Sequence, residues 1–355
     1  MQYKVAWIER SVTWDVGCRA LLVYITHRPP FLTHESSEAP LKADFTFTVT
    51  SKLHHQLLLD YLTSNMPLMD AAFWPQLLAQ GGITIDGNIV SDNQLMEEGQ
   101  VVQYGIDDYE EGQVDTRWST LWQNHEISAI HKPANLPVSR TTRNVYNTLV
   151  QILRRESPWP DAHLLHRLDL ETSGIILIGH DNASASKHQP NLPSLIKRKI
   201  YHAVVKGVPE WTSLDYECEL NTVKDSAIRC QMHKVESGKT SRTKFKRLKT
   251  NGEFSLIECE LMTGRKHQIR AHLSSLGHAI VGDKIYSNNG EFYLKRLQDK
   301  VTEQDYEALL TPHHLLHAYE IHIQPSDQLN DDEVIITDSE YSEPWQVFMK
   351  QQGLD

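Results

Sequence analysis

An acid, a base and a tight turn stand directly before an apolar run in one short stretch of the sequence. Residues 166–169 are His-Arg-Leu-Asp, residues 172–174 are Thr-Ser-Gly, and residues 175–178 are all aliphatic. A turn that leads into a buried strand is rigid, so it would fix the carboxylate of Asp169 at the edge of a sheet. A carboxylate held in this way can serve as a nucleophile or as a general base. The same pattern also fits a structural ion pair between Arg167 and Asp169.

A second stretch, residues 197–207, predicts a strand that begins with three basic residues. Tyr201 shares one face of this strand with Ala203 and Val205, because side chains alternate between the two faces. A tyrosine among small apolar residues is either a plain core residue or an aromatic platform on which a base can stack. The strand pattern alone leaves both interpretations open.

A third stretch, residues 261–272, contains a turn followed by a helical pattern. Thr263 and Gly264 can lead the chain from a strand into a helix, which places Arg265 near the helix N-terminus. Ile269 and His272 follow one and two turns later. An arginine on such a turn is suited to pairing with a carboxylate or a phosphate.

In this order and spacing, the three stretches resemble the motifs of the RluA family of RNA pseudouridine synthases. The matching patterns are HRLD with TSG at 166–174, K-x-Y-x-A-x-x-x-G at 199–207, and TGR-x-HQIR at 263–270 with Gly-Asp at 282–283. The resemblance extends over roughly residues 126–349 and implies a pseudouridine synthase fold with a central mixed, largely antiparallel sheet. Short strands and helices without a regular βαβα alternation independently predict the α+β class.

The resemblance also implies an activity, which is the isomerisation of uridine within RNA. In that reaction the bond from the ring nitrogen to the ribose breaks, the uracil rotates, and its carbon 5 rejoins the ribose. The family requires no metal, nucleotide or redox cofactor, and its members are usually monomers. The expected partner is therefore structured RNA, with 23S rRNA as the first choice and tRNA as the second.

Site roles follow from the positions that match the family motifs. Asp169 matches the essential aspartate, Arg265 matches the arginine that keeps it ionised, and Tyr201 matches the tyrosine that stacks on the flipped uracil. A flipped base leaves a gap in the stack, and Arg167 matches the residue that enters this gap. Two residues are expected to contribute apolar pocket wall: Leu168 and Ile269.

The sequence departs from the family pattern in two places. Asn135 and the Ser-Arg pair at 139–140 stand where relatives often have Gly and His-Pro, and residues 288–312 look like an acidic insertion. These differences bear on substrate choice rather than on the chemistry, because all three expected catalytic residues are present.

The net charge of −11 at pH 7 hides an uneven distribution. Residues 53–116 contain no Lys or Arg, whereas residues 117–296 hold 27 basic and 17 acidic residues, a balance of 27 − 17 = +10. Residues 224–249 form the most basic part, with nine basic and two acidic residues. This stretch is either a phosphate-binding patch or a solvated surface. Three of its residues are expected to bind RNA: Lys239, Arg242 and Lys244.

The chain is long enough for two or three domains. We expect an N-terminal extension without an assigned function at 1–52, a small module at 53–106, a linker at 107–125 and a catalytic domain at 126–355. The module resembles a degenerate copy of a small α/β RNA-binding fold first known from a ribosomal protein. That fold usually carries Arg and Lys on its second helix, but residues 71–75 here are Ala-Ala-Phe-Trp-Pro. Without cations, counterion release contributes little to binding, so a docking role fits the module at least as well.

Composition excludes a wholly disordered chain, a collagen and a multispan membrane protein. Hydrophobic residues make up 40% and charged residues 23%, which is typical of a globular chain, and no apolar run approaches the roughly 20 residues of a membrane span. The four cysteines form no CxxC pair, so we expect reduced thiols and a cytoplasmic location. His313, His314 and His317 have a zinc-like spacing, but no Cys or carboxylate motif accompanies them and we expect no metal.

Two other functions fit parts of the sequence. A non-catalytic RNA-binding or ribosome-assembly factor could retain the same fold, although the intact Asp-Tyr-Arg set argues against it. A glycosidase with an aspartate nucleophile would usually need a second carboxylate about 5–10 Å away, for which Glu171 is the nearest candidate.

Overall fold

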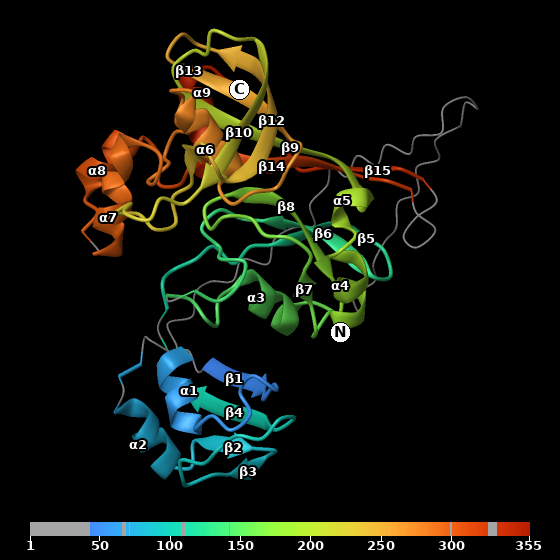
Figure 1. Ribbon diagram of the computed structural model, residues 1–355, viewed down its shortest axis with the longest axis vertical. Coiled ribbons are helices and arrows are strands. Elements are labelled where there is room, and N and C mark those ends of the chain that lie inside the picture. Colours follow the sequence, from blue (N-terminus) through green and yellow to red (C-terminus); the bar gives the residue numbers. More distant parts are fainter. Residues whose placement is uncertain are drawn as a thin grey trace, which may run out of the picture.

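The computed structural model describes residues 43–65, 69–70, 72–107, 109, 111–141, 143–298, 300–325 and 332–355. Most of the predicted N-terminal extension, residues 1–42, lies outside the described residues. The described chain contains two β-sheets, each with its own hydrophobic core (Figure 1). None of its helices is long and apolar enough to cross a membrane.

The smaller sheet has four antiparallel strands in the order β1-β4-β2-β3, packed against two helices. Its elements are β1 (Ala43–Thr48), α1 (Leu58–Asn65), α2 (Phe73–Ala79), β2 (Ile83–Ile85), β3 (Asn88–Ile89) and β4 (Val101–Ile106). β1 pairs with β4 along its whole length, so a strand from the stretch assigned to the extension completes this sheet. Trp74 is fully buried in the core, and Val145 from the larger domain joins it. We call this unit, residues 43–107, the small module.

The larger sheet runs β11-β10-β12-β13-β9-β14-β8-β6-β5, with β15 on β14 and β7 on β8. Its strands are β5 (Ser119–Gln123), β6 (Ile127–Lys132), β7 (His163–Leu164), β8 (Ser173–Gly179), β9 (Ile196–Lys206), β10 (Ser213–Asn221), β11 (His233–Val235), β12 (Lys239–Thr250), β13 (Phe254–Leu261), β14 (Leu316–Ile323) and β15 (Val334–Thr337). Among these strands only β14 and β8 pair in parallel. The prediction of an α+β fold with a mixed, largely antiparallel sheet is confirmed.

Short helices cover this sheet and fill its connections (Figure 1). They are α3 (Leu149–Glu156), α4 (Asn182–His188), α5 (Leu192–Leu195), α6 (Gln268–Ser275), the 3₁₀ turn η1 (Asn288–Gly290), α7 (Glu291–Leu297), α8 (Glu303–Leu309) and α9 (Glu343–Gln352). The stretch expected as an insertion, residues 288–312, contains α7 and α8, which project from one side of the sheet.

The parallel junction explains the glycine of the Thr-Ser-Gly motif. Gly174 has φ +103°, and a Cβ atom there would lie 2.3 Å from the backbone oxygen of Ala318 on β14. Only glycine allows the two strands to approach this closely. The turn before β8 is thereby fixed against the start of β14.

Candidate active site

Asp169 lies on the turn between β7 and β8, next to the parallel junction with β14. Two hydroxyl groups fasten this turn to the chain that enters β14. Oγ1 of Thr172 lies 2.8 Å from Nε2 of His314, and Oγ of Ser173 lies 2.8 Å from Nδ1 of His317. The Thr-Ser-Gly motif therefore holds the Asp169 turn through both its backbone and its side chains.

A buried lysine supports the same turn. Lys132, at the end of β6, has no exposed surface, and its ammonium donates to the carbonyl oxygens of Pro133 at 2.7 Å, Leu136 at 3.0 Å and Leu170 at 3.1 Å. Burial lowers the pKa of Lys132 to about 7, while the nearby carboxylate of Asp169 opposes this shift. The ammonium fixes the backbone of Leu170, the residue after Asp169.

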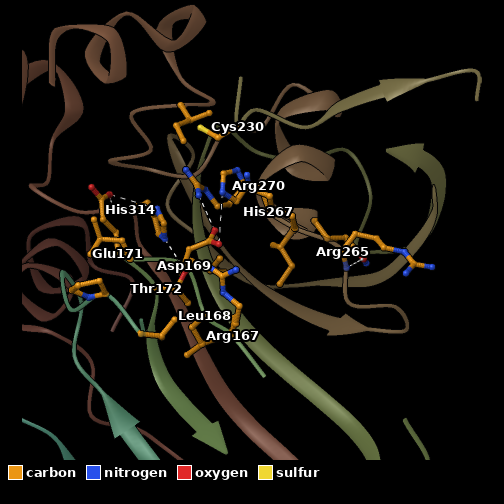
Figure 2. Close-up of a pocket in the computed structure, with 18 of the residues that line it drawn as sticks. Arg167, Leu168, Asp169, Glu171, Thr172, Cys230, Arg265, His267, Arg270 and His314 are labelled. Atoms are coloured by element: carbon orange, nitrogen blue, oxygen red, sulfur yellow. Dashed lines mark hydrogen bonds and ion pairs between the residues drawn. The ribbon is translucent and has the colours of Figure 1, made fainter. Parts of the chain in front are cut away.

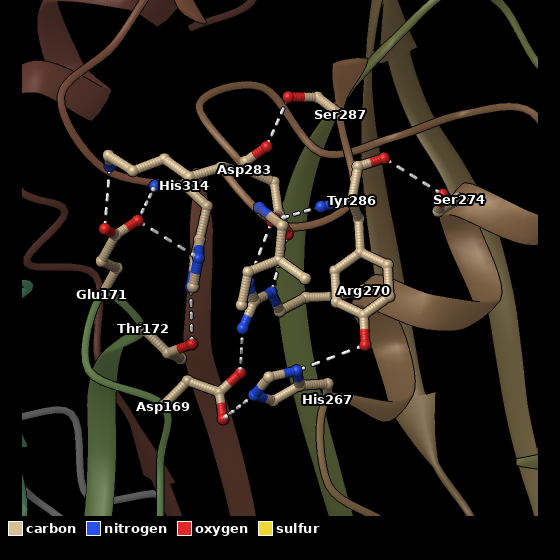
Figure 3. A network of polar contacts seen from close by, with 12 residues as sticks. Asp169, Glu171, Thr172, His267, Arg270, Ser274, Asp283, Tyr286, Ser287 and His314 are labelled. Atoms are coloured by element: carbon tan, nitrogen blue, oxygen red, sulfur yellow. Dashed lines mark hydrogen bonds and ion pairs between the residues drawn. The ribbon is translucent and has the colours of Figure 1, made fainter. Parts of the chain in front are cut away.

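Arg270, in the first turn of α6, pairs directly with Asp169. Its Nη1 donates to Oδ2 of Asp169 at 2.7 Å, while Nε and Nη2 donate to Asp283 at 2.7 and 2.9 Å (Figure 3). The side chain of Arg270 is 5% exposed, and that of Asp169 is 26% exposed. Burial opposes ionisation of Asp169, but the charges of Arg270, His267 and His314, together with the hydrogen bond from Arg270, outweigh it and lower the pKa of Asp169 to about 2. Asp169 is therefore an anion at neutral pH.

Asp283 fixes the orientation of Arg270. Its Oδ1 also accepts the backbone N–H groups of Ile285 at 2.9 Å and Tyr286 at 3.0 Å. Burial opposes ionisation of Asp283, yet Arg270 brings its pKa below the ordinary value. Because one fork of the guanidinium is occupied by a rigid carboxylate, the remaining Nη1 donor is aimed at Asp169.

A second buried ion pair lies beside the first. Nζ of Lys284 donates to Oε1 of Glu171 at 2.8 Å, and the backbone N–H of His314 donates to Oε2 at 3.1 Å (Figure 3). Burial opposes ionisation of Glu171, but Lys284 together with His313 and His314 lowers its pKa to about 2. Both oxygens of Glu171 are engaged, so it is not placed as the second catalytic carboxylate that a glycosidase needs.

A cavity of about 760 Å³ opens beside Asp169. Its wall contains Tyr201 from β9 and Ile269. Leu168 and the exposed Arg167 also line it (Figure 2). Burial, reinforced by the charge of Asp169, raises the pKa of the Tyr201 phenol above its ordinary value, so the phenol is neutral. The cavity thus combines an ionised carboxylate, a neutral aromatic hydroxyl and apolar wall.

The expected pairing of Arg265 with Asp169 is wrong. Nε of Arg265 donates to the carbonyl oxygen of Thr240 at 3.0 Å, and Figure 2 shows its guanidinium pointing away from Asp169. α6 begins only at Gln268, after His267 adopts a left-handed conformation with φ 52°. The turn therefore directs Arg265 toward β12, whereas Arg270 on the helix faces Asp169.

Arg270 and its partners are the functional residues that sequence reasoning missed. Arg270 belongs to the same TGR-x-HQIR motif, so spacing along the sequence could not separate it from Arg265. A usable signal was the Gly-Asp pair at 282–283, since a buried Asp283 needs a cation close to it. Lys132 stands in a Lys-Pro pair to which the sequence alone assigns no role.

Comparison with known proteins shows which family this chain belongs to. The family model for RNA pseudouridylate synthase matches residues 126–275. An RNA pseudouridine synthase of Chloroflexus aurantiacus, itself uncharacterised, is 32% identical over 238 residues, which cover 64% of this chain and 73% of that protein. The chain belongs to the RluA-type RNA pseudouridine synthases. It is an isomerase that converts uridine to pseudouridine in RNA.

Other relatives and solved structures give the same result. A Synechocystis RNA pseudouridine synthase is 29% identical over 237 residues, covering 66% of this chain and 80% of that protein. The mitochondrial tRNA pseudouridine(32) synthase of Saccharomyces cerevisiae is 27% identical, covering 65% of this chain and 50% of that protein. The human RNA pseudouridylate synthase domain containing 4 superposes with a TM-score of 0.50 at 25% identity, covering 66% of this chain and 93% of that one.

The basic patch of this pseudouridine synthase lies on β12, outside the lining of the cavity. Lys239 and Lys244 are exposed there. Arg242 donates to both oxygens of Asp215 on β10, at 2.8 and 2.6 Å. Its guanidinium is thus held in place on the sheet surface, and RNA binding by these three residues stays a prediction.

Two of the three histidines with zinc-like spacing have other contacts in the synthase. His314 and His317 bond to the Thr-Ser-Gly turn, and the described residues contain no group of three His, Cys, Asp or Glu side chains that could hold a metal ion. Asn135, which replaces an expected Gly, adopts the left-handed φ of 59° that Asn tolerates. The loop after Lys132 therefore keeps a glycine-like bend.

Proposed function

We propose that Asp169 is the group that starts the isomerisation and that Arg270 keeps it ionised. The observation that carries this proposal is the 2.7 Å contact between Nη1 of Arg270 and Oδ2 of Asp169 at the wall of the cavity. Oδ1 of Asp169 lies 3.7 Å from Nε2 of His267 and accepts no hydrogen bond from the described residues, and the side chain is 26% exposed, so the carboxylate can still meet a ligand in the cavity. A carboxylate with a pKa of about 2 needs no deprotonation step before it reacts at neutral pH.

The chemistry suits a carboxylate beside an aromatic hydroxyl. Asp169 acts either as a nucleophile at the ribose carbon C1′ or as a base that starts cleavage of the C1′–N1 bond. The electron pair of that bond leaves on the uracil ring, which rotates until its C5 bonds to C1′. The proton on C5 is then lost, and N1 of the ring takes up a proton. Tyr201 stacks against the uracil and, being neutral, can donate or relay a proton.

The substrate is a uridine that has been flipped out of structured RNA. Base flipping is needed because a stacked base cannot reach a carboxylate at the wall of a cavity. We place large-subunit (23S) rRNA first and tRNA second among the targets. The name of the yeast relative supports tRNA as a target class, and the basic middle of the chain supports an RNA backbone as the partner.

Loss of tritium from C5 tests the proposal directly. Large-subunit rRNA and a tRNA pool, both transcribed with [5-³H]uridine, are incubated with the wild-type enzyme and with Asp169→Asn. We expect tritium release from one transcript class with the wild type and none with Asp169→Asn, while filter binding of the RNA changes less than about threefold, because a binding contact is not what the substitution removes.

Two outcomes would contradict the proposal. Unchanged release by Asp169→Asn would show that another group starts the reaction. An equal loss of binding and release would show that Asp169 serves the fold or RNA binding instead. Carbodiimide mapping of total RNA from a deletion strain then identifies the modified uridine.

A further inference from the structure

Three consecutive basic residues near the start of β9 differ in their partners. Nζ of Lys197 lies 3.2 Å from Oε1 of Glu333, and Nε of Arg198 lies 2.9 Å from Oε1 of Glu260. The side chain of Lys199 has no hydrogen bond or ion pair to any residue that the structure describes. The third cation of this run therefore lacks the acid that each of the other two has.

Lys199 also differs from its neighbours in where it points. It lines the catalytic cavity, two residues before Tyr201 on the same strand, and alternate residues of a strand share a face. Its ammonium lies 4.0 Å from the position that a Cβ atom on Gly264 would take, so it is next to the Thr-Gly-Arg turn that also lines the cavity. Lys199 is partly buried, and this burial lowers its pKa.

The carboxylates that line the cavity do not pair with Lys199. Asp169 is paired with Arg270, and Glu171 is paired with Lys284, each at 2.7 to 2.8 Å. No carboxylate of the described residues lies within 4.0 Å of the Lys199 ammonium, since it forms none of their ion pairs. A desolvated ammonium without a partner costs free energy, which an entering anion would recover.

We infer that Lys199 binds a backbone phosphate of the RNA next to the flipped uridine. The reacting C1′–N1 bond must lie at Asp169, and the phosphates are the outermost groups of a flipped nucleotide. Lys199 shares a strand face with Tyr201 and is separate from the Asp169–Arg270 pair. It can therefore bind such a phosphate while Tyr201 stacks on the base. The inference rests on the proposed function for the position of the reacting bond.

Salt dependence of RNA binding tests this inference. The apparent Kd of the transcript that the wild type modifies is measured by filter binding at several NaCl concentrations, for the wild type and for Lys199→Met, Lys199→Arg and Lys197→Met. We expect Lys199→Met to reduce the slope of log K against log salt by about 0.7–0.9, the value for one lost phosphate contact, and Lys199→Arg to keep the slope.

Lys197→Met is the matched control, because it removes the same charge from the same strand at a residue that already has an acid partner. It should leave the slope within error of the wild type. The melting temperature of Lys199→Met should equal or exceed that of the wild type, because the substitution removes a desolvated charge.

Three results would overturn the inference. The first is an unchanged salt slope with lost turnover, which would place the ammonium on the uracil. The second is an unchanged slope with unchanged turnover. The third is a lower melting temperature that Lys199→Arg restores together with the slope, which would make Lys199 a structural residue. Activity of Asp169→Asn is scored separately, so failure of the proposed function is distinguishable from failure of this inference.

Discussion

The small module and the catalytic domain stabilise their folds in different ways. The core of the small module is aliphatic and aromatic. Among its described residues, none of the buried side chains belongs to Asp, Glu, Lys, Arg, His, Asn, Gln, Ser or Thr. The catalytic domain, in contrast, buries many polar side chains. Four of the charged ones lie around Asp169: Lys132, Glu171, Arg270 and Asp283.

This difference distinguishes side chains that stabilise the fold from side chains that serve the reaction. Buried charges are expensive to desolvate, so a network of them around one partly exposed carboxylate indicates chemistry rather than stability. The small module carries only the apolar packing that its fold needs, and its second helix, α2, has no Lys or Arg where an RNA-binding copy would have cations. The comparison predicts that substitutions in the network affect turnover strongly and that surface substitutions in the module do not.

The largest expected effect comes from Arg270. Arg270→Met leaves Asp169 and Asp283 without their cation, and single-turnover tritium release should fall by about 10²–10³-fold. Arg265→Met, on the same motif but bonded to Thr240, should reduce release by less than about tenfold. Equal losses for the two variants would contradict the geometry.

The next expected effect is acid sensitivity of the catalytic domain. Asp169, Glu171 and Asp283 all have lowered pKa values, so the stability they contribute is present above about pH 4 and is lost as the pH falls toward 2. The melting temperature should drop by on the order of 10 °C between pH 5 and pH 3. Hydrogen exchange, corrected for intrinsic rates, should show β8 and α6 losing protection before β4, and the reverse order would break the comparison.

A moderate effect is expected for the basic patch. The double substitution Lys239→Ala with Lys244→Ala should weaken RNA binding by about tenfold and reduce the salt slope by roughly 1.5, since two phosphate contacts are lost. Lys300→Ala with Lys350→Ala removes the same charge outside the patch and should change neither. An unchanged slope for the first pair would exclude β12 as a phosphate contact.

The smallest effect is expected in the small module. Glu97→Gln with Glu98→Gln removes two exposed negative charges and should leave turnover and RNA affinity within about twofold of the wild type, because exposed charges are screened by salt. Steady-state tritium release and filter binding provide the check. A loss greater than tenfold would show that the module surface takes part in substrate recognition.

Much of the fold was predictable because periodicity and motif spacing are local properties. The strand with Tyr201 appears in the structure close to its predicted bounds, and a helix follows Thr263 and Gly264 as predicted. The pairing of β1 with β4 was not predictable, since it joins residues more than fifty positions apart. A short alternating stretch carries no information about its distant partner.

The site was predictable in its residue types but not in its pairing. The sequence indicates an aspartate, a tyrosine and an arginine in one cavity, and the structure places Asp169, Tyr201 and both candidate arginines at its wall. Which arginine reaches Asp169 depends on where α6 begins, and the left-handed residue His267 decides that. One positive φ angle therefore separates Arg270 from Arg265, and such an angle at a non-glycine residue has no clear sequence signature.

Carbon-13 NMR of aspartate carboxyl groups tests the central claim most directly. The Asp169 resonance is assigned by its absence in Asp169→Asn and followed from pH 7 to pH 4 in the wild type and in Arg270→Met. The account predicts that this resonance does not titrate in that range in the wild type and begins to titrate when Arg270 is removed. A wild-type resonance with its midpoint inside that range, or one unaffected by Arg270→Met, would contradict the account.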